Sequence, residues 1–367
     1  MNIICDRTKL LEGINIVLKA VPGKSTMAIL SCIVLQVKNN TINLIANDLQ
    51  LGIQTTIEGN IIEEGEIAVE AKMFSDIIRS FSDDEVIINL DENYVLNLKC
   101  GKANFDIVAK STEEFPLLPT IIKDKKIEIS QFSLKDIIRQ TVFSISDNEN
   151  TKVMTGELFE IHGSTLKVVS LDGHRISIRK ITLNQDYDDV SVIIPGKTLI
   201  EISKLLNGGV DDIINIYFTD KHVLFDFEDT IVVSRLIEGE FYKIDKMLST
   251  DYETKITVNK KVILDSINRT TLLIRDANKK PVIIDIKDNY MGININSSYG
   301  SMHEEMDIEK EGKDILIGFN PRFIMDALRA IDEEEITMYM INPKAPCFIR
   351  DNDESYIYLI LPVNFNI

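Results

Sequence analysis

The sequence predicts an α+β fold built from repeated units, and three observations support this fold class. Three segments share one plan, a short β-branched strand, a break and then an amphipathic helix; they span residues 67–81, 191–206 and 315–331. Lys72, Lys197 and Arg322 hold the equivalent place near the three helix starts, and successive members lie 125 residues apart. Between the helices, short stretches alternate apolar and polar residues and break at Asn, Asp or Gly, which is typical of antiparallel hairpins.

A second, weaker set of segments with the same plan lies between the first three. This set comprises residues 4–21, 128–145 and 256–274. Asp6, Ser133 and Asn259 are predicted to be the N-caps of its helices. The six helices then follow one another at intervals of 61 to 64 residues, which indicates an internal repeat.

Each repeat consists of one strand, one helix and about three further strands, so two repeats make a domain of ~120 residues. We therefore expect three similar domains, at residues 1–122, 123–249 and 250–367. Polar linkers are predicted near 117–126 and 248–255. Antiparallel sheets are expected on one side of each domain and helices on the other.

The composition excludes several classes of protein. At 367 residues the chain is too long for one small domain. Its four cysteines, Cys5, Cys32, Cys100 and Cys347, are far apart and have no nearby His pair, so we expect buried thiols and neither a zinc site nor a disulfide scaffold. No stretch approaches about 18 uninterrupted apolar residues. We expect a soluble, cytoplasmic protein that has no membrane contact, metal or cofactor.

The charge is unevenly distributed along the chain. The formal net charge is −18, which by itself argues against binding to nucleic acid. Each of the six predicted helices nevertheless carries a net positive charge, so the acidic residues lie in the strands and loops. Solvated helix faces often carry Lys and Arg, which is the simpler explanation. All six helices share the property, however, and this favours a basic face that contacts a phosphate backbone without reading its sequence.

Six equivalent units with open sheet edges also suggest closure through a second chain. Such an assembly would be a ring with helices lining the hole and sheets outside, and one chain would form half of it. The sequence does not by itself prove that closure.

Several segments along the whole chain resemble one family in order and spacing, the bacterial sliding clamps, which are the beta subunits of the replicative DNA polymerase. These segments are "TMAILSCIVLQV" (26–37), "EEFPLLP" (113–119), "LFEIHGSTLKVVSLDGHRISI" (158–178), "VIIPGKTLIEI" (192–202), "IGFNPRFIMDAL" (317–328) and "YLILPV" (358–363). The resemblance implies a non-catalytic processivity factor, a head-to-tail homodimer that encircles duplex DNA. It also implies a pocket for short peptides of the polymerase, the clamp loader and repair proteins.

The resemblance, together with the helix charges, implies three sets of site residues. For DNA binding these are Lys24, Lys72, Arg79, Lys135, Arg139, Lys152, Lys197 and Lys204. For the peptide pocket they are Met154, Leu171, Gly173, His174, Arg175, Ile176, Tyr242, Lys246, Met247, Pro346, Ile360, Leu361, Pro362 and Val363. For the dimer contact they are Lys102, Phe105, Ile107, Leu272, Leu273, Glu304 and Glu305, with the two glutamates expected to meet basic groups such as Lys102.

Two departures from the family pattern affect the pocket rim. The usual Pro-Asp-Tyr is absent from "EGEFYKIDKM" (238–247), and Asn364 stands where a basic residue is common. The peptide preference therefore stays open.

Two other functions are compatible with parts of the sequence. An enzyme could use His174 as a base beside Asp172, but no nucleophile, phosphate-binding loop or pair of metal ligands accompanies them. An adaptor that binds peptides and never touches DNA would keep the pocket without needing six positive helices. Salt-dependent retention on circular DNA would distinguish the adaptor from the clamp.

Overall fold

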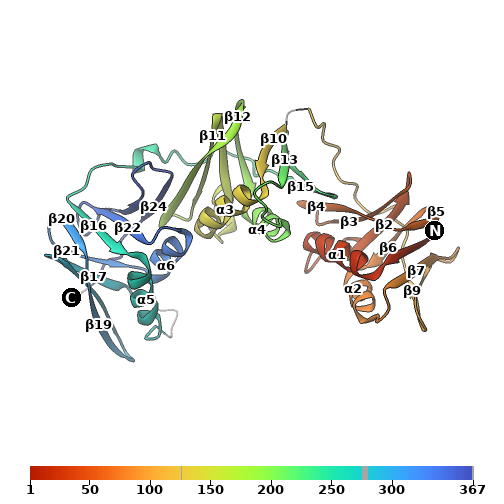
Figure 1. Ribbon diagram of the computed structural model, residues 1–367, viewed down its shortest axis with the longest axis horizontal. Coiled ribbons are helices and arrows are strands. Elements are labelled where there is room, and N and C mark those ends of the chain that lie inside the picture. Colours follow the sequence, from red (N-terminus) through yellow and green to blue (C-terminus); the bar gives the residue numbers. More distant parts are fainter. Residues whose placement is uncertain (125, 275–279, 366–367) are drawn as a thin grey trace. The chain divides into compact units, whose positions relative to one another are not determined.

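The computed structural model describes residues 1–124, 126–274 and 280–365 of the chain (Figure 1). It divides into two compact units. The first contains Met1–Phe132 and Lys204–Leu236, and the second contains Ser133–Ser203 and Ile237–Ile367. In both units the paired strands run antiparallel and helices pack against the sheets, so the predicted α+β class is confirmed.

The first unit holds two sheets and the first pair of helices. In spatial order, the five-stranded sheet consists of β5 (Asn60–Glu63), β1 (Asn2–Asp6), β7 (Glu85–Leu90), β8 (Val95–Cys100) and β9 (Ala103–Val108). The eight-stranded sheet consists of β10 (Lys126–Ser130), β13 (Ile213–Phe218), β14 (His222–Phe227), β15 (Thr230–Arg235), β4 (Leu51–Ile57), β3 (Thr41–Asn47), β2 (Cys32–Lys38) and β6 (Gly65–Glu70). The helical segments are α1 (Arg7–Val17), η1 (Leu18–Ala20), η2 (Ala28–Ser31) and α2 (Ala71–Ser80).

The second unit also holds two sheets. The seven-stranded sheet consists of β11 (Gly156–Leu171), β12 (Arg175–Pro195), β24 (Tyr356–Ile360), β23 (Cys347–Arg350), β22 (Glu335–Met340), β16 (Thr254–Asn259) and β20 (Glu309–Gly312). The four-stranded sheet consists of β19 (Gly300–Asp307), β18 (Tyr290–Ser297), β17 (Val282–Lys287) and β21 (Ile315–Phe319). The remaining helices are α3 (Gln131–Thr141), η3 (Val142–Ser144), η4 (Glu149–Thr155), α4 (Gly196–Leu205), η5 (Asp245–Met247), α5 (Lys260–Thr271) and α6 (Pro321–Ala330).

The predicted helix starts are mostly confirmed. Asp6 caps α1 by accepting a hydrogen bond from the N–H of Lys9 (2.9 Å), and Asn259 caps α5 in the same way from Val262 (3.1 Å). The assignment of Ser133 is wrong, because α3 already begins at Gln131. The N–H groups of its first two residues donate to backbone carbonyls in the loop 209–212.

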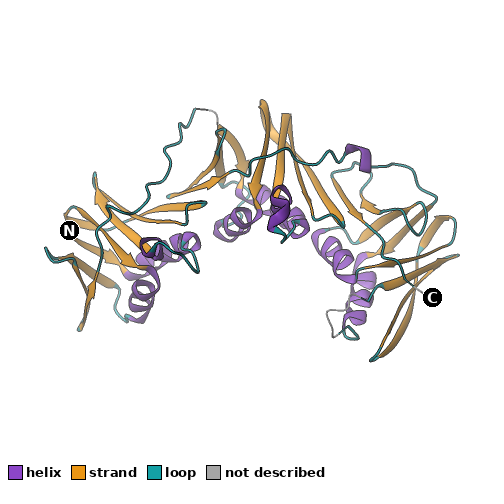
Figure 2. Ribbon diagram, turned by 180° about the vertical axis from the view of Figure 1, so that it is seen from behind, coloured by secondary structure: helices purple, strands orange, loops and turns teal. Residues whose placement is uncertain are grey.

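The apolar stripes of the helices form the interior, as their periodicity predicts. In α2, Phe74 and Ile78 are completely buried, and in α6 Ile324 and Leu328 are. Figure 2 shows α1 beside α2, and α5 beside α6, each pair on one face of its strands.

The strand order shows the internal repeat directly. The sheet order β6-β2-β3-β4 recurs as β21-β17-β18-β19, and the order β1-β7-β8-β9 recurs as β10-β13-β14-β15 and as β16-β22-β23-β24. Two repeats are joined where β4 pairs with β15, and two others where β12 pairs with β24. At the first of these junctions, the Thr55 and Thr230 hydroxyls hydrogen-bond to each other at 2.9 Å. Among the described residues, no helix is both long enough and apolar enough to cross a membrane.

Candidate functional site

Residues 172–174 form a tight turn between β11 and β12. Gly173 has a φ of +85°, which glycine adopts without the strain that a side chain would cause. The Asp172 carboxylate accepts hydrogen bonds from the backbone N–H groups of His174 (2.9 Å) and Arg175 (3.1 Å), which fixes the turn locally. From Arg175 onward, β12 pairs with β24, so the tip of the hairpin lies alongside the last strand of the chain.

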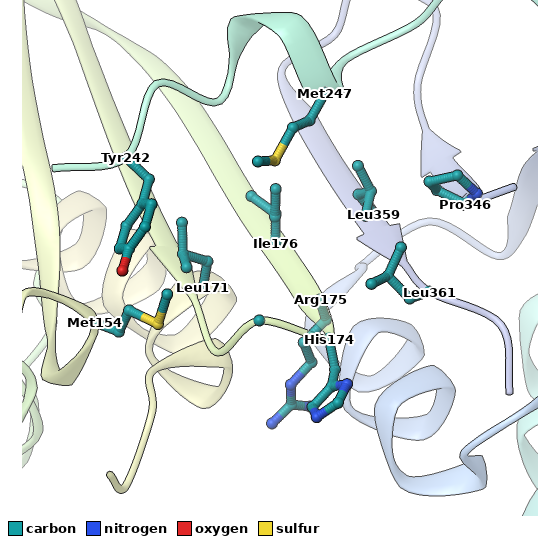
Figure 3. A pocket seen from close by; sticks show the side chains of 11 residues that line it. Met154, Leu171, His174, Arg175, Ile176, Tyr242, Met247, Pro346, Leu359 and Leu361 are labelled. Carbon is teal, nitrogen blue, oxygen red and sulfur yellow. The ribbon is translucent and has the colours of Figure 1, made fainter. Parts of the chain in front are cut away.

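A pocket of ≈ 360 Å³ lies beside this hairpin (Figure 3). Its floor is aliphatic, because Leu171, Ile176 and Leu359 point into it and are each at most 5% exposed. Tyr242 and Met247, from the segment that joins β15 to β16, are 43% and 52% exposed. The rest of the lining is Met154, Gly173, His174, Arg175, Pro346 and Leu361. Exposed Met and Tyr side chains over an apolar floor can adapt to the apolar side chains of different ligands.

The segment after β24 is held in place by two backbone hydrogen bonds. The N–H of Leu361 donates to the His174 carbonyl (2.9 Å), and that of Val363 donates to the Gly318 carbonyl (2.8 Å). A Cβ at Gly318 would lie 2.6 Å from the ring of Phe365 and 3.0 Å from the Val363 carbonyl oxygen, so glycine permits this close approach.

The structure brings most of the predicted pocket residues together. Ten of them line one cavity: Met154, Leu171, Gly173, His174, Arg175, Ile176, Tyr242, Met247, Pro346 and Leu361. Lys246, Pro362 and Val363 adjoin lining residues along the chain but do not line the pocket.

The prediction for Ile360 is wrong. Successive side chains of a strand point to opposite faces of the sheet. Ile360 is 1% exposed and packs in the core cluster beneath α5 and α6, whereas its neighbour Leu359 faces the pocket. Sequence reasoning missed Leu359.

Arg175 lines the pocket and also makes contacts within the fold. Its side chain is 11% exposed, and its guanidinium donates to the Asp172 carboxylate (2.9 Å), the Asp326 carboxylate (2.7 Å) and the carbonyl of Phe143. These contacts involve all three guanidinium nitrogens.

The geometry of His174 and Asp172 does not support catalysis. The His174 ring stacks on Phe323 with centroids 6.0 Å apart, while the Asp172 carboxylate bonds to Arg175. The acid therefore does not orient the imidazole as a base. Over the described ranges, no group of three or more His, Cys, Asp or Glu side chains could hold a metal ion.

Most of the cations predicted to bind DNA are exposed. Among the described residues, exposed cations of this set are Lys24, Lys72, Lys152, Lys197 and Lys204, whereas Lys135 is half-buried. Arg79 is 58% exposed and lies 3.7 Å from Asp76 on the same helix, α2.

Arg139 differs from the other predicted DNA-binding residues. Its guanidinium donates to the Asp332 carboxylate (2.8 Å) and to the Ala330 carbonyl (3.2 Å) at the end of α6, as well as to Asp136. Arg139 therefore links α3 to the end of α6 through hydrogen bonds. Because its guanidinium is used within the fold, we remove Arg139 from the set proposed to contact DNA.

The residues predicted for the dimer contact lie on or beside the edge strands β9 and β19. Phe105 is 39% exposed and packs on Phe81 with ring centroids 5.7 Å apart. Leu272 is 72% exposed, and Lys102 is exposed as well, whereas Leu273 is half-buried. Ile107 is only 8% exposed, so its side chain is buried within its own unit.

The two glutamates already have partners within the chain. Glu304 accepts hydrogen bonds from Arg269 and from Ser266 (2.9 Å), and the bond from Arg269 lowers the pKa of Glu304. Glu305 lies 3.1 Å from His303. A pairing of either glutamate with Lys102 of another chain would have to share or replace these contacts.

Comparison with known proteins identifies the class of this fold. Three family profiles match consecutive parts of the chain: the N-terminal domain of the DNA polymerase III beta subunit over 1–119, its central domain over 128–243 and its C-terminal domain over 245–364. A "Beta sliding clamp" of Halalkalibacterium halodurans is 30% identical, with 99% of each chain covered.

Solved structures agree with this assignment. A putative DNA polymerase III beta subunit from Eubacterium rectale is 55% identical with a TM-score of 0.97, and the DNA polymerase sliding clamp of Bacillus subtilis is 31% identical with a TM-score of 0.97. Both comparisons cover 100% of each chain. The protein belongs to the DNA polymerase III beta subunit family, the beta sliding clamps, which are non-catalytic processivity factors.

Proposed function

We propose that two copies of this chain associate head to tail into a ring that slides on duplex DNA and tethers replication and repair proteins through the pocket beside Gly173. The observation that carries the proposal is the pairing of the repeats. The strands β9, β15 and β24 are equivalent members of three repeats, and two of them are paired with a neighbouring repeat, namely β15 with β4 and β24 with β12. The strand β19 is the counterpart of β4 in the sheet β19-β18-β17-β21. Over the described residues, β9 and β19 are then left at the open edges of their sheets.

The internal repeat also predicts the register of the contact between copies. In the repeat, Ala103 at the start of β9 is equivalent to Thr230 at the start of β15. Likewise, Gly300 at the start of β19 is equivalent to Leu51 at the start of β4. Because Val232 lies opposite Ile53 at the junction within the chain, Phe105 should lie opposite Met302 of a second copy. Asn104 should then lie opposite His303 of that copy.

Head-to-tail pairing makes both contacts of a two-chain ring identical. The exposed Phe105 and Leu272 would lose apolar surface to water when the edges meet, which favours association.

Cysteine cross-linking tests this register. We expect Asn104→Cys/His303→Cys or Phe105→Cys/Met302→Cys to form covalently closed dimers, because directly opposed residues have the Cα spacing that a disulfide needs. Two pairs are tried because opposed positions alternate between two geometries along a ladder. The native thiols should not interfere: all four are buried, and burial raises the pKa of Cys5 and Cys347 to about 12.

The matched control is Asn104→Cys/Ser301→Cys, which is displaced by two residues on the same edge. The proposal is wrong if this control cross-links as well as the opposed pairs, or if the wild-type chain stays monomeric at micromolar concentration in light scattering.

DNA contact is proposed from exposed cations rather than from base-reading side chains. Lys24, Lys72, Lys152, Lys197 and Lys204 are point charges on a chain of net charge −18, so binding should be weak, independent of sequence and strongly dependent on salt. Base preference with little salt dependence would contradict this assignment.

A further inference from the structure

The side chain of Arg175 connects the pocket to a helix that does not line it. Arg175 follows the turn that forms the pocket wall, and its guanidinium reaches Asp326 on α6 at 2.7 Å. The same guanidinium lies over the ring of Phe323, also on α6, with 4.5 Å between Cζ and the ring centroid. In Figure 3 the ends of the Arg175 and His174 side chains point away from Ile176 and Leu359 on the pocket floor.

The contacts of Arg175 come from three elements. Nε donates to Asp172 of its own turn (2.9 Å), Nη1 donates to Asp326, and Nη2 donates to the Phe143 carbonyl in η3. With 11% of the side chain exposed, these charge-assisted bonds form where water competes poorly. Removing one partner would leave a largely buried donor unsatisfied and free the turn to move.

We propose that Asp326 is a positioning residue for peptide binding, which it supports through Arg175 without touching the peptide. This inference rests on the proposed function of the pocket. Asp326 is not among the lining residues, yet it bonds to Arg175, which in turn bonds to Asp172 in the wall formed by residues 172–175. His174 is held on the same helix by its stacking on Phe323. The β11–β12 turn forms the pocket wall, and α6 holds that turn in place from outside the pocket.

The chain contains a matched control for this ion pair. Asp332 follows α6 and accepts a hydrogen bond from Arg139 of α3 at 2.8 Å. It therefore makes the same type of bond to a preceding repeat, and among the described residues its hydrogen bonds reach Arg139 and Gln140 and not the turn 172–175. Asp326→Asn and Asp332→Asn remove the same charge and differ in whether the pocket wall is involved.

The test is fluorescence anisotropy with a fluorescein-labelled peptide carrying the clamp-binding motif of the replicative polymerase, using the full-length protein. We expect Asp326→Asn to weaken binding about tenfold, which corresponds to ~1.4 kcal/mol. Asp332→Asn should change the affinity less than twofold. Arg175→Lys should weaken binding by a similar factor, and adding Asp326→Asn to Arg175→Lys should cause no further loss, because the two residues act as one unit.

Asp326→Glu keeps the carboxylate and should retain most of the affinity, which covers the case in which Asp326→Asn unfolds. Unchanged binding by Asp326→Asn would overturn the inference, as would an equal loss in Asp332→Asn, which would indicate a general effect on stability. Failure of the wild-type protein to bind the peptide would instead overturn the proposed function of the pocket, and the inference with it.

Discussion

Glu157, near the start of β11, is a completely buried carboxyl group, and its replacement should change how stability depends on pH. Neither carboxyl oxygen accepts a hydrogen bond from the described residues. The Thr141 hydroxyl nearby donates to the Ile137 carbonyl (2.7 Å) instead. Burial raises the pKa of Glu157 to about 8.

The sign of the effect follows from the proton count. Between the ordinary pKa of 4.5 and the folded value of about 8, the native protein holds a proton on Glu157 that the unfolded chain has released. The free energy of unfolding therefore falls as the pH rises through this window, by up to ~1.4 kcal/mol per pH unit. Between pH 5 and 8 the loss is on the order of 3 kcal/mol. Glu157→Gln has no proton to lose, so this contribution should disappear.

Urea unfolding followed by circular dichroism at pH 5, 6.5 and 8 measures the difference. We expect the stability of Glu157→Gln relative to wild type to increase steadily with pH, whatever its sign at pH 5. Glu149→Gln, at an exposed position in the neighbouring η4, is the control and should follow the wild-type profile. If the profiles of wild type and Glu157→Gln are parallel, Glu157 does not carry a shifted proton and this reasoning fails.

Two further predictions concern the pocket and the DNA contacts. Gly173→Ala places a side chain at a φ of +85°, which costs about 1–2 kcal/mol of strain. It should weaken peptide binding several-fold in fluorescence anisotropy, while light scattering still shows a dimer. Unchanged affinity would mean that the turn is not part of the site. Lys24→Glu combined with Lys152→Glu should lower DNA affinity at least about tenfold at low salt. The slope of log K against log salt concentration should also become shallower, by about one for each phosphate that is no longer neutralised. An unchanged slope would exclude these lysines from the DNA-binding surface.

The repeat architecture was predictable because each helix carries its own apolar stripe. Phe74 and Ile78 in α2, like Ile324 and Leu328 in α6, are spaced for one buried face, and all four are buried. The caps Asp6 and Asn259 were predictable because their bonds are local, whereas α3 starts on contacts to a loop about 80 residues further along the chain, which no local pattern reveals.

The pocket was predicted through family resemblance, and Ile360, which packs in the core instead, shows the limit of that route. In β24, Tyr358, Leu359 and Ile360 are all at most 3% exposed, because both faces of this strand are covered. Without polar residues in alternation, the sequence does not indicate which residues face the pocket. Leu359 could have been found only by placing every second residue from Leu361 on one face.

The sequence also does not reveal the acidic residues that bond to Arg139 and Arg175. Arg139 and Arg175 each bond to an acid more than 150 residues away. In the sequence, Asp326 only reduces the positive charge of its helix, and nothing marks it as the anchor of a distant turn. Charge counts thus indicate basic helices, but they do not separate cations that are available to a phosphate from cations used within the fold.

Topological capture on DNA tests the central claim, a ring closed through β9 and β19, most directly. The cross-linked Asn104→Cys/His303→Cys dimer is mixed with linear duplex, the duplex is ligated into a circle, and the salt is raised to about 1 M to screen electrostatic contacts. We predict that protein remains on the circle and is released when the circle is cut once. If the salt removes the cross-linked protein from circular DNA as readily as from linear DNA, the protein does not encircle the duplex.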